Sequence, residues 1–167
     1  DWLTTSHGLS QGYIHDIIQD RDGFMWFGTK DGLNRYDGYT FKEYTYNIYD
    51  PNSISNNTVH HLYEDSKGRI WAITDNGLNI YDKKRDNFRR IMHDPKNENS
   101  LADDKISLPI IELNDGRFLV MPEEESIHLI TLPDDFLEKD LNPEIVRLKT
   151  PEVHNASHLY KDKHGKV

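Results

Sequence analysis

The sequence predicts an all-β protein that is built from repeated four-stranded antiparallel units, and three observations support this prediction. First, residues 9–37 align without a gap with residues 54–82, and eleven of the 29 aligned pairs are identical. Second, each copy consists of short apolar runs separated by Gly, Asp and Asn, the residue types that favour tight turns between strands. Third, no segment shows the sustained 3.6-residue apolar period of an amphipathic helix.

The first half of each copy predicts two strands joined by a tight turn. In the first copy the initial strand ends in Asp20-x-x-Gly23, and the second copy repeats this pattern at Asp65 and Gly68. A type I turn favours Asp at its first position and Gly at its last, so a hairpin is expected here. The next run, 24–29, is apolar at consecutive positions, which indicates a strand buried on both faces.

The second half of each copy predicts a further hairpin. Asp31-Gly32 and Asn76-Gly77 are strong hairpin signals, and the turn type that they favour requires positive φ at both central residues. A third strand follows each of them, and the fourth strand, at 41–46 in the first copy, carries more charge. We therefore expect the fourth strand to be the outermost and most solvated strand of each unit.

Four antiparallel strands in a repeat of about 40 to 50 residues are typical of a β-propeller blade. A third, weaker copy follows the two clear ones, and residues 158–167 match the start of another. Closed propellers need about four to eight blades. We therefore expect an incomplete arc of about three and a third blades, from a longer protein rather than from an assembly of chains that closes the ring. The predicted boundaries are 1–53 for blade 1 with its N-terminal lead-in, 54–100 for blade 2, 101–150 for a degenerate blade 3 and 151–167 for the truncated start of blade 4.

Residues that recur between the two clear copies are predicted to serve the blade structure. The tryptophans lie at the same position of an apolar strand in each copy, which favours packing between blades over stacking against a sugar. The glycines are explained by turn geometry. The recurring structural residues are Gly23, Gly68, Trp26, Trp71, Thr29, Thr74, Gly32, Gly77, Leu33, Leu78, Tyr36 and Tyr81.

Composition argues against several classes of function for this segment. The net charge is −9, and the 20 basic residues are scattered among 29 acidic ones, so no basic face for nucleic acid is expected. No run approaches the roughly 18 apolar residues that a membrane span needs. Cysteine is absent, which excludes disulfides and thiolate metal sites.

Two recurring patterns raise the question of a metal or catalytic site. His15 and His60 recur, but the chain has no His-Glu-x-x-His motif, and recurrence at one blade position favours a shared structural role. Asp20 and Asp65 lie three residues before Gly, whereas a sialidase-type box places its Asp two residues before Gly. We therefore predict no catalytic residue, no metal and no cofactor in this segment.

The connection between the first two blades is the best candidate for a ligand-binding segment. Connections of this kind gather at one end of a propeller channel, and packing does not demand their polar side chains. The candidate ligand-binding residues are Asn52, Ser53, Ser55, Asn56 and Asn57.

The first copy, GLSQGYIHDIIQDRDGFMWFGTKDGLNRYDG at 8–38, resembles the two-component regulator propeller repeat, and the second copy is similarly close. Such repeats form the periplasmic sensor region of bacterial hybrid two-component histidine kinases. The resemblance implies a ligand-sensing module that responds to an oligosaccharide and is commonly a homodimer. It also implies that the membrane anchor and the kinase domains lie outside this segment, which is then not itself an enzyme.

The same resemblance implies signalling by conformational population shift, in which ligand binds one arrangement of the sensor better than another. Two other functions remain open from the sequence. One is a propeller lyase whose catalytic residues lie on blades outside this chain. The other is a scaffold that docks a protein partner on its rim.

Overall fold

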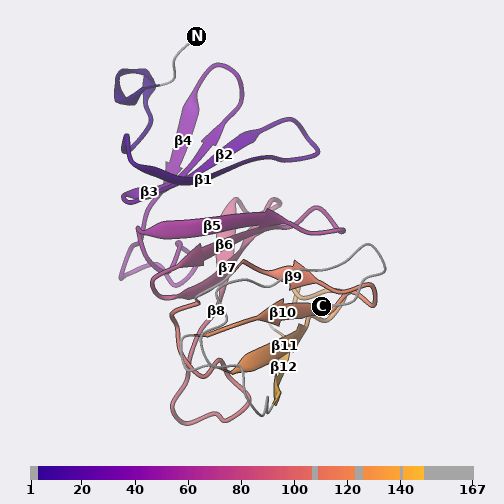
Figure 1. Ribbon diagram of the computed structural model, residues 1–167. Helices are drawn as coiled ribbons and strands as arrows, with labels where there is room; N and C mark the ends of the chain where they lie inside the picture. The colour runs from indigo at the N-terminus through magenta and orange to yellow at the C-terminus, as the bar shows by residue number, and fades with distance from the viewer. Residues whose placement is uncertain (1–3, 107–108, 123–125, 140, 149–167) are drawn as a thin grey trace. The chain divides into compact units, whose positions relative to one another are not determined.

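The computed structural model describes residues 4–106, 109–122, 126–139 and 141–148. Within these residues it contains one short 3-10 helix and twelve strands, arranged as three four-stranded antiparallel sheets. Strands that are consecutive in the chain are neighbours in each sheet, so every sheet is an up-and-down meander (Figure 1). This confirms the predicted all-β fold of propeller blades. The expected start of a fourth blade, 151–167, lies outside the described residues.

The chain divides into two compact units, 1–90 and 91–167. The first unit holds two of the sheets, and the second unit holds the third. Among the described residues, no helix combines the length and the apolar character that crossing a bilayer would require.

The first sheet follows the 3-10 helix η1, and its first strand is partly exposed to solvent. Its first strand alternates between partly buried and exposed residues, whereas its second strand is largely buried. The fourth strand lies at the other edge of the sheet, and its two central residues are exposed, as its charge predicts. The elements are η1 (Thr5–His7), β1 (Ile14–Gln19), β2 (Met25–Thr29), β3 (Gly32–Tyr36) and β4 (Phe41–Tyr44).

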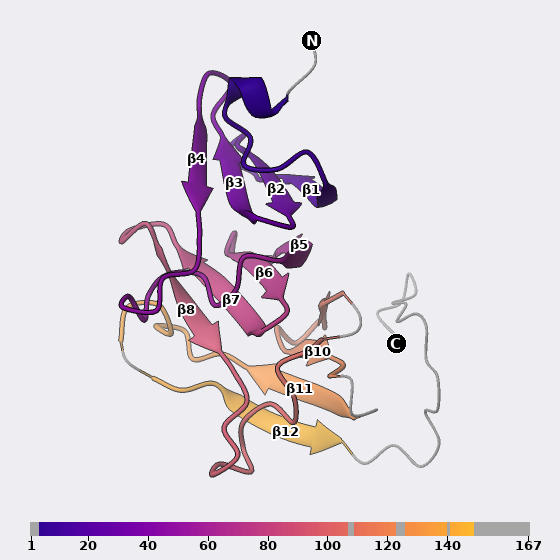
Figure 2. The same cartoon turned by 90° about the vertical axis from the view of Figure 1, so that its left-hand side faces the viewer.

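The second sheet repeats this arrangement with more complete burial. Its two central strands are buried at every residue, which agrees with their consecutive apolar side chains. In Figure 2, β4 leads into the connection that precedes this sheet. The strands are β5 (Val59–Glu64), β6 (Ile70–Thr74), β7 (Gly77–Asp82) and β8 (Asn87–Ile91).

The two sheets of the first unit pack against each other through an apolar core. Trp26 of β2 is 1% exposed. Its ring centroid lies 6.0 Å from that of Tyr44 in its own sheet and 5.0 Å from that of Tyr81 in the second sheet. Close approach is required where Gly28 meets Val59, because a Cβ on Gly28 would lie 3.0 Å from the Val59 Cγ1. The recurring Trp is therefore part of the contact between sheets.

The predicted β2–β3 and β6–β7 hairpins form, and the positive φ predicted for Asp31-Gly32 and Asn76-Gly77 is confirmed for the glycines but is wrong for Asp31 and Asn76. Thr29 pairs with Gly32 across a two-residue loop, and the positive φ is found at Gly32 (107°) and Gly77 (88°), just after each loop. Asp86 is the one non-glycine with positive φ in the described part of the chain. The reason is a local one: the Thr29 hydroxyl accepts from the Asp31 N–H at 3.0 Å and donates to the Gly32 carbonyl at 2.8 Å. These bonds favour a type I turn followed by a left-handed glycine.

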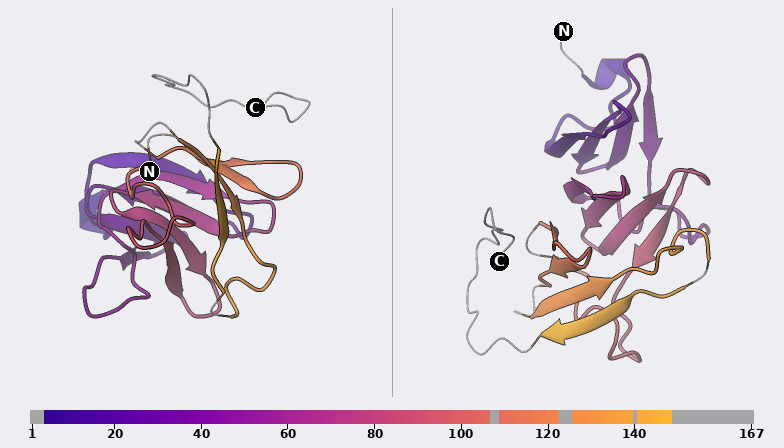
Figure 3. Two further views of the ribbon diagram at one scale, coloured as in Figure 1. Left: turned by 90° about the horizontal axis from the view of Figure 1, so that it is seen from below. Right: turned by 90° about the vertical axis from the view of Figure 1, so that its right-hand side faces the viewer.

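The third sheet forms the core of the second unit. Phe118 and Ile130 face each other across β10 and β11, and neither is exposed. The orange β11 and the yellow β12 run side by side in both views of Figure 3, in agreement with their pairing. The strands are β9 (Ile111–Glu112), β10 (Phe118–Val120), β11 (Ile127–Thr131) and β12 (Glu144–Leu148).

A buried histidine in the third sheet makes the stability of this unit depend on pH. His128 of β11 is fully buried, its Nε2 lies 2.9 Å from the Ser126 hydroxyl, and its Nδ1 has no hydrogen-bond partner. Burial, assisted by the nearby Arg147 guanidinium, lowers the pKa of His128 to about 4. The folded unit therefore holds a neutral imidazole at neutral pH.

Lowering the pH from 7.5 to 4.5 is expected to destabilise the second unit through His128. The unfolded chain binds the proton below a pKa of about 6.5 and the folded unit binds it only near pH 4. Stability is thus fully present above pH 6.5 and decreases as the pH falls toward 4, by about 2 to 3 kcal/mol. Thermal unfolding at both pH values should show a smaller loss in His128→Phe than in the wild type. Equal losses would contradict the assignment.

Candidate functional site

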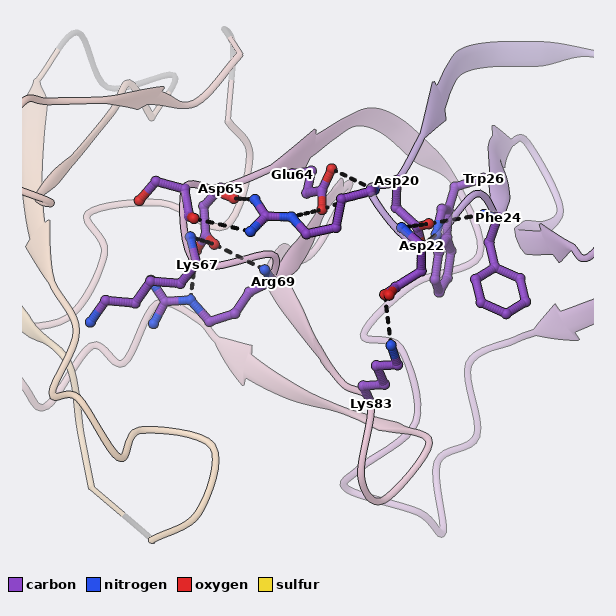
Figure 4. A network of polar contacts seen from close by, with 11 residues as sticks. Asp20, Asp22, Phe24, Trp26, Glu64, Asp65, Lys67, Arg69 and Lys83 are labelled. Atoms are coloured by element: carbon purple, nitrogen blue, oxygen red, sulfur yellow. Dashed lines mark hydrogen bonds and ion pairs between the residues drawn. The ribbon is translucent and has the colours of Figure 1, made fainter.

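The Asp-x-x-Gly-x-x-Trp pattern is a self-contained structural device in the first sheet. Asp20 caps the β1–β2 turn by accepting from the N–H groups of Asp22 and Phe24 at 3.0 and 2.9 Å. Its other carboxylate oxygen accepts from the Trp26 indole N–H at 2.8 Å (Figure 4). The carboxylate therefore fixes the turn and the core tryptophan together.

The second sheet repeats this device with an additional cation. Asp65 is 1% exposed and accepts from the backbone N–H groups of Lys67 and Arg69. Its second oxygen accepts from the Trp71 indole at 2.9 Å and from the Arg69 Nε at 2.6 Å. These bonds engage both oxygens of each recurring aspartate, so each carboxylate holds its turn and its tryptophan together.

The two turns are also joined directly. Arg21, in the β1–β2 turn, donates through Nε to Glu64 at 2.7 Å and through Nη2 to the Asp65 carbonyl at 2.7 Å. Lys83 approaches the other side of the same turn, where its ammonium lies 2.6 Å from Asp22 (Figure 4). This region therefore stabilises the contact between sheets.

The recurring Ser, Thr and Asn form a second device that ties the lead-in of each sheet to its central strands. In the second sheet, Ser55 donates its N–H to the Asn79 side-chain oxygen at 2.9 Å, and its hydroxyl lies 2.9 Å from that of Thr74. Asn79 in turn donates to the Ser55 hydroxyl at 2.8 Å. Ser10 makes the equivalent three contacts in the first sheet, at 2.7 to 3.2 Å.

This network changes the interpretation of one ligand-binding candidate. Ser55 is 2% exposed, and its N–H and its hydroxyl are both engaged within the sheet. The side chain is therefore directed into the fold and not toward solvent.

Ser53 forms hydrogen bonds that hold the connection between the first two sheets. Its hydroxyl lies 2.9 Å from the Asn47 N–H, and Arg90 of β8 donates to the Ser53 carbonyl and hydroxyl, both at 2.8 Å. The second unit has the same arrangement, because Arg147 of β12 donates to the Ser100 carbonyl at 3.1 Å. Sequence comparison missed this recurring arginine, since the spacing between serine and arginine differs between the two copies.

The three asparagines of the connection lie nearer to the surface. Asn52 is exposed, and its carbonyl accepts from the Phe88 N–H at 2.8 Å. Asn56 accepts from the Thr58 N–H through its side chain. Asn57 links the connection to the first sheet, because its side-chain oxygen accepts from the Tyr46 N–H at 2.7 Å.

The recurring histidines lie at β-bulges in β1 and β5, the first strand of each of the two sheets. Ile14 pairs with Thr29 and Asp16 pairs with Gly28, so His15 is an extra residue in the ladder. His60 is the extra residue at the equivalent point of β5. Bulges redirect a side chain away from its regular direction and are frequent beside functional sites. We expected a structural role from the recurrence of these histidines; in the structure His15 is exposed and the His60 side chain is 35% exposed.

The bulges bring the two imidazoles together on the surface. Their ring centroids are 5.1 Å apart in an edge-to-face arrangement, and the Tyr13 ring lies 5.0 Å from His15. Tyr13 is 63% exposed. The Nε2 atom of His60 lies 2.7 Å from a carboxylate oxygen of Asp75, which follows β6. We call Tyr13, His15, His60 and Asp75 the bulge-histidine surface.

The charges around this surface are mixed. Partial burial, followed by the neighbouring His60 and Lys30, lowers the pKa of His15 below its usual value. Burial also lowers the pKa of His61, against the opposing effect of Asp16. The His15 ring is therefore mostly neutral at pH 7 and can act as both donor and acceptor. No group of three or more metal-ligating side chains is present in the part of the chain that the structure describes.

The bulge-histidine surface suits a ligand that offers flat apolar faces together with hydroxyl groups. Exposed rings supply contact area, and the imidazoles and the carboxylate supply hydrogen bonds. Sequence comparison showed the recurring histidines but gave no indication of the bulges, which depend on how β1 pairs with β2 and β5 pairs with β6.

Comparison with known proteins identifies the repeats. The family model described as "Two component regulator propeller" matches residues 8–31 and 53–76. A histidine kinase of Formosa agariphila, named P4, is 53% identical over 53 residues, which are 32% of this chain and 4% of that protein.

Solved structures share the fold. Extracellular domains of two hybrid two component systems from B. thetaiotaomicron are each 22% identical, with TM-scores of 0.66 and 0.61 over 89% and 99% of this chain. A catalytically inactive virginiamycin B lyase from Staphylococcus aureus is 14% identical, with a TM-score of 0.57 over 87% of this chain. This chain spans 20%, 28% and 44% of those three chains, respectively. At these identities the likeness shows the fold alone.

Proposed function

Because residues 8–31 and 53–76 are two component regulator propeller repeats, we propose that this chain belongs to the ligand-sensing propeller of a hybrid two-component sensor histidine kinase. The repeat match carries this proposal, and the 53% identity to part of a histidine kinase supports it. A periplasmic location, with the rest of the protein anchored in the membrane, is part of this proposal and rests on the resemblance of the repeats to those of such sensors.

The ligand of this sensor is an oligosaccharide. The surface that supports this assignment carries exposed Tyr13 and His15 rings beside the hydrogen-bonding groups of His60 and Asp75. Sugar binding commonly combines ring contact with hydrogen bonds to hydroxyl groups, which these side chains offer. The sequence resemblance described above points to the same ligand class.

Signalling follows from a shift between conformations of a homodimeric ectodomain. A ligand changes the balance between two arrangements only through its different affinity for each of them. A difference of about tenfold corresponds to about 1.4 kcal/mol of coupling, which is within the usual range for allosteric proteins.

A second candidate is an interaction scaffold that docks a protein partner on its rim. The observation in its favour is a pair of adjacent, highly exposed side chains in the connection between the first two sheets, namely Ile48 at 73% and Tyr49 at 93% exposed. Exposed apolar groups that lie together are typical of interaction sites. A lyase activity has no comparable support, because the likeness to virginiamycin B lyase extends to the fold alone.

Titration of the complete ectodomain with a panel of oligosaccharides tests the sensing function. We expect saturable binding of at least one glycan and a signal from a kinase-dependent reporter in cells given that glycan. Absence of binding across the panel, together with unchanged signalling after deletion of the ectodomain, would refute the proposal. Glycan-independent capture of one protein partner would favour the scaffold.

A further inference from the structure

We propose that the bulge-histidine surface, Tyr13, His15, His60 and Asp75, is a binding site for an uncharged oligosaccharide. This inference rests on the proposed sensing function and adds to it the place of contact and the class of glycan. The motivating observation is that two bulges bring side chains from neighbouring sheets together at an exposed position.

The recurrence of the bulge is the first step of the argument. β1 and β5 are edge strands of their sheets, and an unpaired extra residue disrupts the ladder locally and is frequent both at sheet edges and beside functional sites. Here both extra residues are histidines, and their rings meet at 5.1 Å although they come from different sheets. The rings lie at the surface of the first unit, where His15 is exposed and the His60 side chain is 35% exposed.

The hydrogen-bonding pattern of His60 is the second step. Asp75 is an acceptor when it is ionised, so the Nε2 atom of His60, at 2.7 Å, carries the proton of this contact. The Nδ1 atom, on the other edge of the ring, can hydrogen-bond a ligand hydroxyl, which is both a donor and an acceptor. The carboxylate thereby orients the ring, as second partners commonly do for histidines.

The charge balance decides between classes of glycan. The charge of Lys30 lowers the pKa of His15, and the carboxylate of Asp75 raises it. The carboxylate of Asp16 raises the pKa of the neighbouring His61. The lowered pKa of His15 favours its uncharged ring, and the carboxylate of Asp75, whose side chain is 47% exposed, belongs to the surface itself. The whole chain carries a net charge of −9. These negative charges would repel a sulfated or uronic acid-rich glycan, whereas they would not repel an uncharged one.

The Tyr13 ring supplies the contact area. It is 63% exposed, and it lies edge-on to His15 at 5.0 Å, so the two rings form adjacent faces of one surface. Edge-to-face pairs of this kind hold their orientation, which reduces the entropy cost of ordering side chains on binding.

Binding measurements on the complete ectodomain test the inference. A panel of neutral, uronic acid-containing and sulfated oligosaccharides is screened first, and the best ligand is titrated by calorimetry. We expect a neutral glycan to bind best. Tyr13→Ala and His15→Ala should each weaken its binding by about tenfold, since each removes a ring contact. Tyr39→Ala, which removes a ring that is 91% exposed elsewhere in the first unit, should change the affinity less than twofold.

The outcomes separate this inference from the proposed function. Neutral-glycan binding that Tyr13→Ala and His15→Ala leave unchanged would overturn the site while the sensing function stands. A clear preference for sulfated or uronic acid-rich glycans would overturn the assigned class. Failure of every glycan to bind the ectodomain would refute the sensing function itself. Unchanged thermal midpoints of Tyr13→Ala and His15→Ala exclude loss of folding as the cause of weaker binding.

Discussion

Asp65→Ala is expected to destabilise the first unit by about 3 to 5 kcal/mol, the range for removing one partner from a buried charged network. The Asp65 side chain has no exposed surface, and it accepts from two backbone N–H groups, the Trp71 indole and the Arg69 guanidinium. Alanine would leave a buried indole N–H without its acceptor and Arg69 without its carboxylate. Thermal or urea-induced unfolding, followed by tryptophan fluorescence, measures the loss.

Asp115→Ala is the matched control. Asp115 also lies in an Arg-containing turn between two strands, and its carboxylate contacts Arg117 at 2.6 Å. Its side chain is 52% exposed, however, and exposed ion pairs contribute little. The unfolding midpoint should therefore barely move in this variant. Equal effects of the two substitutions would show that burial of the Asp65 network is not the source of its stability.

Replacing Asn79 with leucine is expected to cost about 2 to 4 kcal/mol, because buried polar groups lose their partners. Asn79 is fully buried in β7, where it accepts from the Ser55 N–H and donates to the Ser55 hydroxyl. Leucine has a similar size but offers neither a donor nor an acceptor. Chemical denaturation should show a lower midpoint with an unchanged slope.

Asn52→Leu provides the comparison for the asparagine substitution. Asn52 lies in the connection before β5 and is exposed. A surface substitution of this kind usually changes stability by less than about 0.5 kcal/mol. If Asn79→Leu were as mild as Asn52→Leu, the polar network between the lead-in and the central strands would contribute nothing measurable.

The Asp–Trp device explains which repeat features are lost together in the third sheet. The turn 113–117 keeps the same backbone bonds as the turn 65–69, with the Leu113 N–H donating to the Arg117 carbonyl at 2.7 Å. Leucines occupy both the aspartate position and the tryptophan position, at 113 and 119. Without the indole, a buried carboxylate would have no indole N–H from which to accept a hydrogen bond. The aspartate and the tryptophan are therefore replaced together. Both replacements are visible in the sequence, but the hydrogen bond between indole and carboxylate that explains them is visible only in the structure.

The candidate site shows the limit of sequence reasoning most clearly. Polar residues in the connection, such as Ser53 and Ser55, were expected to be available to a ligand, yet both hydroxyls are engaged within the first unit. The histidines were expected to be structural; their rings do join the two sheets at 5.1 Å, and His15 is exposed as well. Polarity and recurrence alone do not distinguish a side chain that holds the fold from one that faces solvent.

By itself, the sequence determined the duplicated unit, its four strands and the positions of its turns, because short-range turn chemistry and the alternation of apolar residues depend on neighbours in the chain. The tertiary structure decided which polar residues form hydrogen bonds within and between the sheets and which remain at the surface. Those assignments depend on strand register, on the bulges at His15 and His60, and on contacts such as Arg21 to Glu64 between residues 43 apart in the chain. Such contacts form only when separate sheets pack against each other, so local sequence preferences do not specify them.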